Sequence, residues 1–426
     1  MSFVFWLYRF LSILIAPLVR LWVYVRLGQG LEEREHLKER FGCHSIKRPE
    51  GRVLWFHAAS VGETVSLIPL LKSYKAQSPE DNLLLTTTTV TAAKIAQQRL
   101  KGICFHQYVP FDVYPWIDRF LKYWQPSLAV FVESEVWPNI ITQSKRRGIP
   151  LVLLNASLSD RSYQRWCQWR WFATLIFKNF DLCMAPFDET LKRLKDLGAD
   201  RVEPSPHLKF AAEPLPFEFQ QLDFYRSLIK NRPVWVVAST HPGEEEKILE
   251  AHQRLKKHFP SLLTILIPRH PHRAETILDM CYEQGETKET ACLHTEQRPN
   301  ADTAILLVNT IGELGLFYRL SPIVFIGGSF MPVGGHNPIE PAMLGCVVLY
   351  GPHMHNFRNI CQILQDVTVS VATVDKLVEM VTHLLSHQDA AFCLGKKASE
   401  TVLQQAESLD GIVTRLLKIS HQKPRE

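Results

Sequence analysis

Short apolar runs alternate with helical patterns from residue 52 onward. In the first half the apolar runs are RVLWFHA, NLLLTTTT, SLAVFVE, PLVLLNAS and DLCMAP, at residues 52–58, 82–89, 127–133, 150–157 and 181–186. The segments between them, such as ETVSLIPLLKSYKA, place apolar residues at helical spacing. Strands interleaved with helices of this length predict βαβ units and a parallel sheet.

The segment AAEPLPFE, residues 211–218, interrupts this alternation with two prolines and is typical of a linker. A second series follows, with predicted strands VWVVAS, LLTILIP, TAILLV, IVFIGG and CVVLYG, and the chain from Val374 to Ile419 is helical throughout. We therefore predict an α/β protein with two doubly wound, Rossmann-like domains that face each other across a cleft. The predicted divisions are an N-terminal helix at 1–27, a first domain at 28–212, a linker at 213–230 and a second domain at 231–426.

The N-terminal segment from Phe3 to Val25 is almost entirely apolar and aromatic, but it contains Arg9 and Arg20. No A-x-A cleavage site follows, which argues against a removed signal peptide. Two membrane-associated interpretations remain, a single transmembrane anchor or an interfacial helix whose arginines reach lipid phosphates. In both, Arg20, Arg26 and Arg34 would face anionic headgroups on the cytoplasmic side. The alternative is a buried helix of the first domain.

Composition narrows the class of protein. The 426 residues are 46% hydrophobic and 21% charged, which is ordinary for a globular protein. A formal net charge of +5 suits anionic substrates or an anionic membrane surface and is too small to indicate nucleic-acid binding. The nine cysteines include no C-x-x-C pair, so neither a disulfide framework nor a zinc site is predicted.

Three polar motifs of the first half follow predicted strands. In HAASVGET, a turn of small residues brings Glu63 to a helix N-terminus, where it either meets a ligand or serves only as a first-turn carboxylate. In FVESEVWPN, strand alternation places Glu133 and Glu135 on one face, which suggests acid–base chemistry, unless one of them caps the next helix. In PHLKF, Lys209 either neutralises a phosphate or carboxylate, or is an ordinary solvated lysine.

The second half repeats this arrangement. ASTHPGEEE ends in carboxylates at a helix start, and IPRHPHR gathers cationic or titratable groups at the next strand end. Because no carboxylate completes a ligand set there, an anion site is favoured over a metal site. NTIGEL contributes Gly312 and Glu313. GGHNPIEP is a glycine-rich loop that leads into a helix, where phosphate can bind and where Glu340 can accept hydrogen bonds from ribose hydroxyls.

Together, HAASVGE, ESEVWPN, LKF, STHPGEE, PRHP, GGHNPIEP and GPHMHNF, in this order and spacing, resemble the motifs of the Kdo (3-deoxy-D-manno-octulosonic acid) transferases of Gram-negative bacteria. The resemblance covers nearly the whole chain. It implies a GT-B fold, independence of metals and cofactors, CMP-Kdo as donor, and a lipid A precursor (lipid IVA) as acceptor. It also implies a location on the cytoplasmic face of the inner membrane.

The resemblance also implies residue roles. Glu63 corresponds to the proton acceptor of the family, and Glu133 and Lys209 correspond to groups that stabilise the transition state, with inversion at C2 of Kdo. The family's CMP contacts fall on Pro268, Arg269, Ile311, Gly312, Glu313, Asn337, Pro338, Ile339 and Glu340. One departure is visible, because the family usually has G-[NS]-L-K-F-D where this chain has PHLKFA.

Two alternatives belong to other functional classes. A GT-B transferase or epimerase that uses a UDP-sugar would need a site for uracil and a diphosphate. A non-catalytic membrane scaffold would need none of these side chains, and the presence of Glu63, Glu133, Lys209 and Glu340 argues against it.

Overall fold

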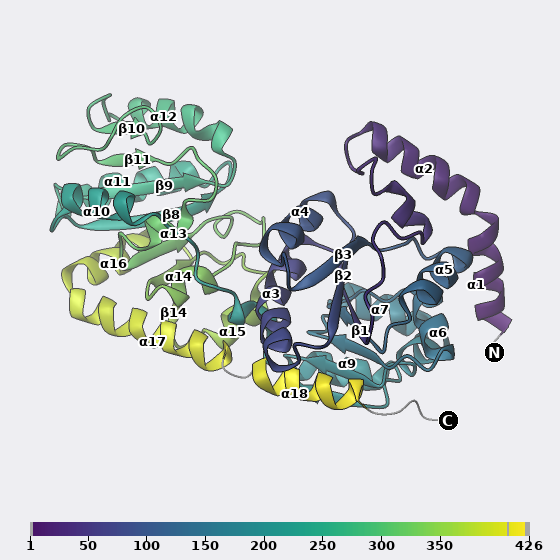
Figure 1. Ribbon diagram of the computed structural model, residues 1–426. Coiled ribbons are helices and arrows are strands. Elements are labelled where there is room, and N and C mark those ends of the chain that lie inside the picture. The colour runs from purple at the N-terminus through teal and green to yellow at the C-terminus, as the bar shows by residue number, and fades with distance from the viewer. Residues whose placement is uncertain (1–2, 407–408, 422–426) are drawn as a thin grey trace. The chain divides into compact units, whose positions relative to one another are not determined.

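The computed structural model describes residues 3–406 and 409–421. The chain divides into two compact units, residues 1–212 with 405–426 and residues 213–404 (Figure 1). Each unit contains one seven-stranded sheet, and all strand pairs within each sheet are parallel. This confirms the predicted α/β architecture with two doubly wound, Rossmann-like domains.

The sheet of the first unit has the strand order β3-β2-β1-β4-β5-β6-β7. Its strands are β1 (Val53–Ala58), β2 (Asn82–Thr87), β3 (Cys104–Tyr108), β4 (Leu128–Val132), β5 (Leu151–Leu154), β6 (Leu182–Ala185) and β7 (Val202–Pro204). Every residue of β1 and β4 is buried, as expected for central parallel strands covered on both faces. The chain first builds the sheet outward on one side of β1 and then returns to its other side. The carboxyl ends of β1 and β4 therefore form a topological switch point, where ligands bind in such sheets.

Helices cover both faces of this sheet. They are α3 (Val61–Gln77), α4 (Val90–Arg99), α5 (Tyr114–Trp124), α6 (Pro138–Arg146), α7 (Asp160–Gln168), α8 (Arg170–Phe177), α9 (Asp188–Asp196) and α18 (Leu409–Ser420), with short 3₁₀ helices η1 (Leu37–Phe41) and η2 (Leu208–Ala211). One apolar core lies between the sheet and α5, α6, α8 and α9, and the other between the sheet and α3, α4 and α18.

Helix α18 departs from the predicted domain division, which assigned the chain through residue 426 to the second domain. Its apolar side chains are buried in a core of the first unit, and they are Ile412, Val413, Leu416 and Ile419. The helix contacts α3, and Asp410 accepts a hydrogen bond of 3.0 Å from the Ser73 hydroxyl. The apolar face of this helix needs a partner, and the first sheet supplies it.

The N-terminal segment forms two helices rather than the single predicted one, α1 (Phe3–Leu14) and α2 (Ala16–Gly28). They are bent by 52° relative to each other. Pro17 lies in the first turn of α2, and proline has no N–H to continue the hydrogen bonding of α1. Within the described residues, no single helix is long and apolar enough to cross a bilayer, whereas the bent pair passes on length and composition.

The sheet of the second unit has the order β10-β11-β9-β8-β12-β13-β14. Its strands are β8 (Val234–Thr240), β9 (Leu263–Pro268), β10 (Ala291–Leu293), β11 (Ile305–Leu307), β12 (Ile323–Ile326), β13 (Val347–Tyr350) and β14 (Thr368–Ser370). As in the first unit, the first strand is central, so the carboxyl ends of β8 and β12 form a second switch point.

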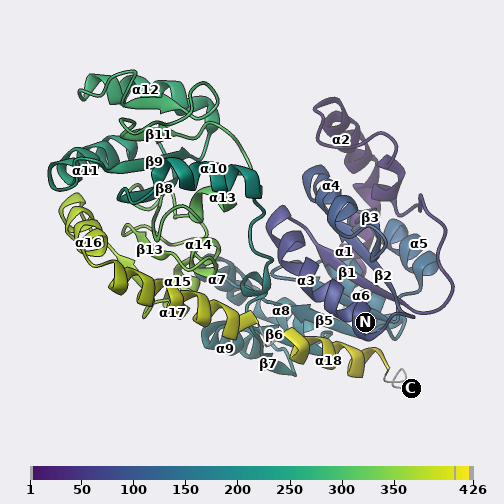
Figure 2. The same cartoon turned by 60° about the vertical axis from the view of Figure 1, so that its left-hand side comes forward.

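The helices of the second unit are α10 (Phe219–Ile229), α11 (Glu245–His258), α12 (Ala274–Glu283), α13 (Leu314–Tyr318), α14 (Ile339–Met343), α15 (Arg358–Ile363), α16 (Val374–Ser386) and α17 (Gln388–Ala406), with the 3₁₀ helix η3 (Pro271–Arg273) (Figure 2). Helix α10 occupies most of the segment predicted as a linker. Its residues Leu222, Tyr225 and Ile229 are buried, so this segment packs within the second unit.

Candidate active site

Glu63 lies at the start of α3, directly after β1. The helix begins at the N-cap residue Ser60, whose hydroxyl oxygen accepts the Glu63 N–H at 3.2 Å. In return, the Glu63 carboxylate accepts the Ser60 hydroxyl at 2.8 Å and the Ala59 N–H at 2.7 Å. This reciprocal arrangement is a capping box, so the predicted first-turn role is present. The same hydrogen bonds hold the carboxylate in one orientation, and its oxygens keep lone pairs for a further partner.

Glu133 follows β4 and has a left-handed backbone with φ of 60°. Its N–H still donates to the Leu154 carbonyl at 3.0 Å, which fixes the residue at the sheet edge. Burial raises the pKa of Glu133, the ammonium of Lys209 opposes that rise, and the nearby charges of Glu63 and Glu135 add to it. Glu133 therefore interacts electrostatically with Glu63, Glu135 and Lys209, and we refer to these four residues as the acidic cluster.

The prediction that strand alternation places Glu133 and Glu135 on one face is wrong. The strand ends at Val132, and the left-handed turn at Glu133 breaks the alternation. Glu135 accepts the indole N–H of Trp137 at 2.6 Å and lies 3.6 Å from Nε2 of the buried His57. Although burial raises the pKa of Glu135, its contacts with His57 and Trp137 hold that pKa below its usual range.

Lys209 lies in η2, between two fully buried anchors, Leu208 and Phe210. The His207 ring accepts the Lys209 N–H at 3.2 Å through Nδ1, and Asn155 Oδ1 accepts the Leu208 N–H at 3.3 Å. Burial and the charge of Lys209 lower the pKa of His207 to about 3, so the ring is neutral and can act as an acceptor. His207 is therefore the N-cap residue of η2.

The second unit gathers positive and titratable groups at its switch point. His241 follows β8, Arg269 and His270 follow β9, and His336 lies in the loop after β12. Nε2 of His241 and Nε2 of His336 are 2.8 Å apart, and the His241 and His270 rings meet edge to face with centroids 5.9 Å apart. We refer to His241, Arg269, His270 and His336 as the basic cluster.

The two facing rings of the basic cluster are neutral near neutral pH. Burial lowers the pKa of His336 to about 4, helped by the charges of His241, Arg269 and His270. Burial also lowers the pKa of His241, as do the charges of His270, Arg269 and Arg273. The arginines therefore carry permanent charge at this edge. The hydrogen bond between the two Nε2 atoms uses one donor and one acceptor, so the paired neutral imidazoles keep one donor and one acceptor between them. This combination suits a phosphate with neighbouring polar groups.

Glu244 supports the loop of the basic cluster, a role that the sequence analysis missed. Its fully buried carboxylate accepts the backbone N–H groups of Gly328, Ser329 and Phe330 at 2.6, 3.1 and 2.9 Å. Burial raises the pKa of Glu244, and these bonds oppose the rise. The signal was present in ASTHPGEEE, but the sequence alone does not show which backbone groups the carboxylate meets.

The glycine pair in the loop after β12 is required by its backbone and its surroundings. Gly334 and Gly335 have φ of 110° and 75°, values that other residues rarely adopt. A Cβ on Gly334 would lie 2.2 Å from Asn356, and one on Gly335 would lie 2.1 Å from Met354. The loop therefore packs closely against the segment after β13.

The remaining predicted nucleotide contacts also follow parallel strands of the second sheet. Pro268 is the last residue of β9, Ile311 and Gly312 lie in the loop after β11, and Ile311 is 87% exposed. Glu313 Oε2 lies 3.2 Å from Nε2 of His294.

The last four predicted contacts, Asn337, Pro338, Ile339 and Glu340, follow the glycine pair. Asn337 Oδ1 accepts the Ile339 N–H at 3.1 Å, where α14 begins after Pro338. Burial raises the pKa of Glu340, and a hydrogen bond from Asn337 opposes that rise. Within the described residues, no group of three or more histidine, cysteine, aspartate or glutamate side chains is placed to hold a metal ion.

Comparison with known proteins connects this geometry to a family. A family model for 3-deoxy-D-manno-octulosonic-acid transferase (kdotransferase) matches residues 35–212. The 3-deoxy-D-manno-octulosonic acid transferase of Rickettsia bellii (strain RML369-C) is 34% identical over 97% of this chain and 98% of its own length. That of Haemophilus influenzae (strain ATCC 51907 / DSM 11121 / KW20 / Rd) is 32% identical over 96% of this chain and 97% of its own length.

Solved structures support the fold. A glycosyltransferase from Rickettsia africae ESF-5 matches 87% of this chain and 98% of its own with a TM-score of 0.60 at 13% identity. UDP-GlcNAc 2-epimerase from Neisseria meningitidis matches 86% of this chain and all of its own with a TM-score of 0.60 at 15% identity. These likenesses confirm the GT-B fold and say nothing of the substrate. With full-length relatives above 30% identity, the chain belongs to the Kdo transferase family and is a glycosyltransferase.

Proposed function

We propose that this enzyme transfers Kdo from CMP-Kdo to a lipid A precursor, lipid IVA, with inversion at C2 and with Glu63 as the general base. The observation that carries the proposal is the electrostatic interaction of Glu133, at the switch point of the first sheet, with both Glu63 and Lys209. A carboxylate base beside a second carboxylate and an ammonium provides both proton transfer and charge stabilisation.

The reaction requires one base and no enzyme nucleophile. Glu63 takes the proton of the acceptor hydroxyl as that oxygen bonds to C2 of Kdo. The bond between C2 and the phosphate oxygen of CMP breaks, and its electron pair leaves with CMP. In this scheme Glu133 faces the positive charge that develops at C2. Lys209 compensates the negative charge that develops on the leaving CMP phosphate. Attack opposite to the leaving group inverts the configuration at C2.

The basic cluster is our proposed donor site. Arg269 supplies a permanent charge for the CMP phosphate, and the neutral rings of His241 and His336 supply hydrogen bonds. Asn337 lies in the same glycine-rich loop, Glu340 lies in the first turn of the α14 helix that follows it, and both are our candidates for the ribose hydroxyls. Because arginine and lysine supply the positive charge in this scheme, we expect transfer without a metal or cofactor.

We further propose that the enzyme lies on the cytoplasmic face of the inner membrane through α1 and α2. Support comes from apolar side chains that these helices expose, among them Trp6, Phe10, Leu14, Leu18, Leu21 and Trp22. The prediction that Arg20 and Arg26 face anionic headgroups does not match their contacts. Arg26 pairs with Glu32 at 2.8 Å, and Arg20 lies over the Phe41 ring at 5.4 Å. Deletion of residues 1–26 should release the protein from membrane pellets, and a wholly soluble full-length protein would refute this proposal.

A nucleotide-release assay tests the donor. With lipid IVA as acceptor, CMP should be released from CMP-Kdo, and the lipid should gain the mass of Kdo. Release of UDP from UDP-sugars with no reaction of CMP-Kdo would favour the epimerase-like alternative. No reaction of a folded protein with either donor would favour the scaffold.

A further inference from the structure

A cavity of about 410 Å³ lies in the first unit where α1 meets α6 and α8. Its lining combines apolar, polar and cationic side chains: Phe5, Thr142, Lys145, Arg146, Leu175, Lys178 and Asn179. Helix α1 contacts both α5 and α6, and these three helices lie side by side in Figure 1. The cavity is therefore bordered by one of the two helices that we assign to the membrane surface.

The cavity has an excess of positive charge. Lys145 Nζ is paired with the Asp181 carboxylate at 2.7 Å. Arg146 and Lys178 are exposed, and no acidic side chain within the described residues forms an ion pair with either. Two cations are left over at the rim of a cavity whose wall includes Phe5. An anionic group with an apolar continuation is the ligand that this lining matches.

Aromatic side chains extend from the cavity along the surface. The Phe5 and Phe172 rings are 5.9 Å apart, and the Phe172 and Trp171 rings are 5.8 Å apart. Trp171 and Trp169 are 49% and 60% exposed. Exposed tryptophan beside lysine and arginine is typical of a surface that lies at the headgroup level of a bilayer.

The cavity is separate from the proposed acceptor site. Lys145 and Arg146 end α6 just before β5, and Lys178 follows α8 just before β6, so they lie at the amino-terminal edge of the first sheet. The acidic cluster lies at the carboxyl edge. Helix α1 connects the two edges, because Phe5 lines the cavity while the hydroxyl of Ser12 accepts a hydrogen bond of 3.2 Å from Asn139, at the start of α6.

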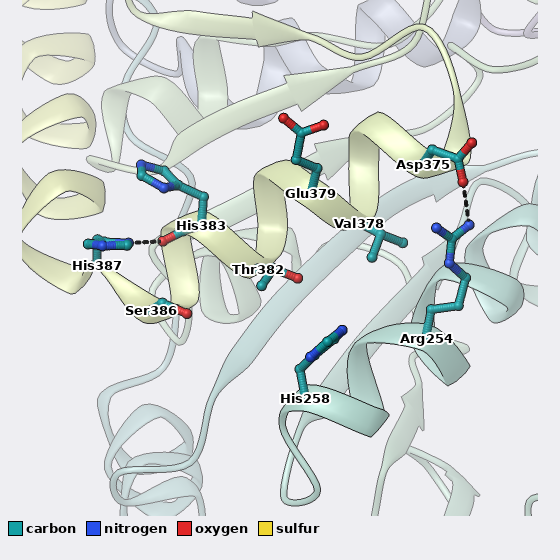
Figure 3. A pocket seen from close by; sticks show the side chains of 9 residues that line it. All are labelled: Arg254, His258, Asp375, Val378, Glu379, Thr382, His383, Ser386 and His387. Atoms are coloured by element: carbon teal, nitrogen blue, oxygen red, sulfur yellow. Dashed lines mark hydrogen bonds and ion pairs between the residues drawn. The ribbon is translucent and has the colours of Figure 1, made fainter.

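A second cavity, of about 420 Å³, differs from the first in the charge of its lining. It lies between α11 and α16 in the second unit and includes His258, His383 and His387 (Figure 3). Arg254 and Asp375 pair at 2.7 Å in its wall, and Nδ1 of His387 donates to the His383 carbonyl at 2.9 Å. With its arginine neutralised and no exposed tryptophan in its lining, this cavity has no comparable preference for an anionic lipid.

We infer that the cavity between α1, α6 and α8 binds the headgroup phosphate of an anionic phospholipid of the bilayer. Arg146 and Lys178 contact the phosphate, Phe5 and Leu175 contact the apolar part, and Trp169 and Trp171 lie at the interface. The inference rests on the proposed membrane association through α1 and α2. It adds a second point of attachment, at the opposite edge of the first sheet from the acidic cluster, which would orient the enzyme relative to a lipid acceptor.

The test uses the full-length protein and vesicles of two compositions, phosphatidylcholine alone and phosphatidylcholine with phosphatidylglycerol. The variant R146Q/K178Q should bind the phosphatidylglycerol vesicles roughly 10- to 30-fold more weakly than the wild type, as expected for the loss of two interfacial cations. Binding to pure phosphatidylcholine should be unchanged. The matched control K192Q/K195Q removes the same charge from exposed positions on α9 and should keep its preference for phosphatidylglycerol.

The outcomes distinguish the headgroup site from membrane association through α1 and α2. An equal loss in both double variants would show a general surface-charge effect and overturn the headgroup site. Unchanged binding of R146Q/K178Q would also overturn it, with membrane association intact. If the wild type bound neither vesicle, membrane association through α1 and α2 would fail, and the headgroup site with it. Transfer of Kdo to detergent-dispersed acceptor does not require this site and should be normal in R146Q/K178Q.

Discussion

The acidic and basic clusters occupy equivalent places in two similar sheets and carry opposite charge. In both units the first strand is central, and the polar groups of each cluster follow strands of the parallel sheet. In the first unit these groups are mainly carboxylates, and in the second they are mainly histidine and arginine. The backbone arrangement cannot account for this difference. It determines where polar groups meet, and the loop side chains determine the chemistry.

The two clusters also differ in how they are supported. Glu63 is held by Ala59 and Ser60, its neighbours in the chain. The loop of the basic cluster is instead held by Glu244, which lies 84 residues before Gly328. Local support can be recognised in a sequence, whereas support across such a separation requires the structure.

Glu63→Gln should lower kcat by about 10²–10⁴-fold, because the amide cannot accept the acceptor's proton. Donor affinity should hardly change, since the nucleotide is assigned to the second unit. Steady-state kinetics with lipid acceptor would measure both. Thr373→Ala is the matched control, because it removes the N-cap of α16 without touching either cluster. A folded Glu63→Gln protein with near wild-type turnover would reduce Glu63 to its capping role.

Arg269→Ala should weaken CMP-Kdo binding by roughly 10- to 150-fold, the equivalent of about 1.5–3 kcal/mol for a charge-assisted contact. Turnover at saturating donor should fall less than donor affinity. Calorimetric titration with CMP gives the affinity directly. Arg254→Ala removes an arginine of the same unit that already has Asp375 as its partner. Equal affinity in both variants would move the nucleotide away from the basic cluster.

Glu244→Gln should lower the free energy of unfolding by about 1–3 kcal/mol, because the amide group presents a donor to backbone N–H groups that need an acceptor. Looser support of the loop should also weaken CMP binding. Thermal melting with and without CMP measures both effects. Glu246→Gln, at an exposed position two residues later, provides the control. If both variants melted alike, the basic cluster would not depend on this distant carboxylate.

His207→Asn should flatten the dependence of stability on pH. The pKa of His207 is lowered from 6.5 to about 3 in the folded protein, so only the unfolded chain takes up a proton between these values. Stability is fully present above pH 6.5 and is lost as the pH falls toward 3, by on the order of 1 kcal/mol in the upper part of this range. Asparagine keeps an acceptor for the Lys209 N–H and does not titrate. Denaturant unfolding on either side of pH 6.5 should show a smaller difference for the variant, and an unchanged difference would assign the effect to other groups.

The sequence predicts the central strands well and the edges poorly. β1 and β4 are continuous apolar runs because both faces of the sheet are covered. The edge strand β3 was missed because CFHQY mixes polar and apolar residues and is only partly buried. The short strands β10 and β14 were missed as well, since three residues are too few to establish a period.

The candidate site shows the same limit. The positions of Glu63, Glu133 and Lys209 after strands follow from the sequence, because parallel strands end at one edge of a sheet. The break in strand alternation at Glu133 does not, because it depends on a left-handed residue that no glycine marks. The buried contact of His57 with Glu135 was equally invisible, since it joins the ends of two strands.

Helix α18 has a consequence for how the protein is made. The first unit needs Ile412, Leu416 and Ile419 to complete one of its two cores, and the ribosome adds these residues only after the whole of the second unit. The second unit lies wholly within residues 213–404 and can therefore fold before the unit that precedes it in the chain. Until α18 has been synthesised, an apolar face of the first sheet stays open, and the nascent enzyme is exposed to aggregation and to chaperones over that time.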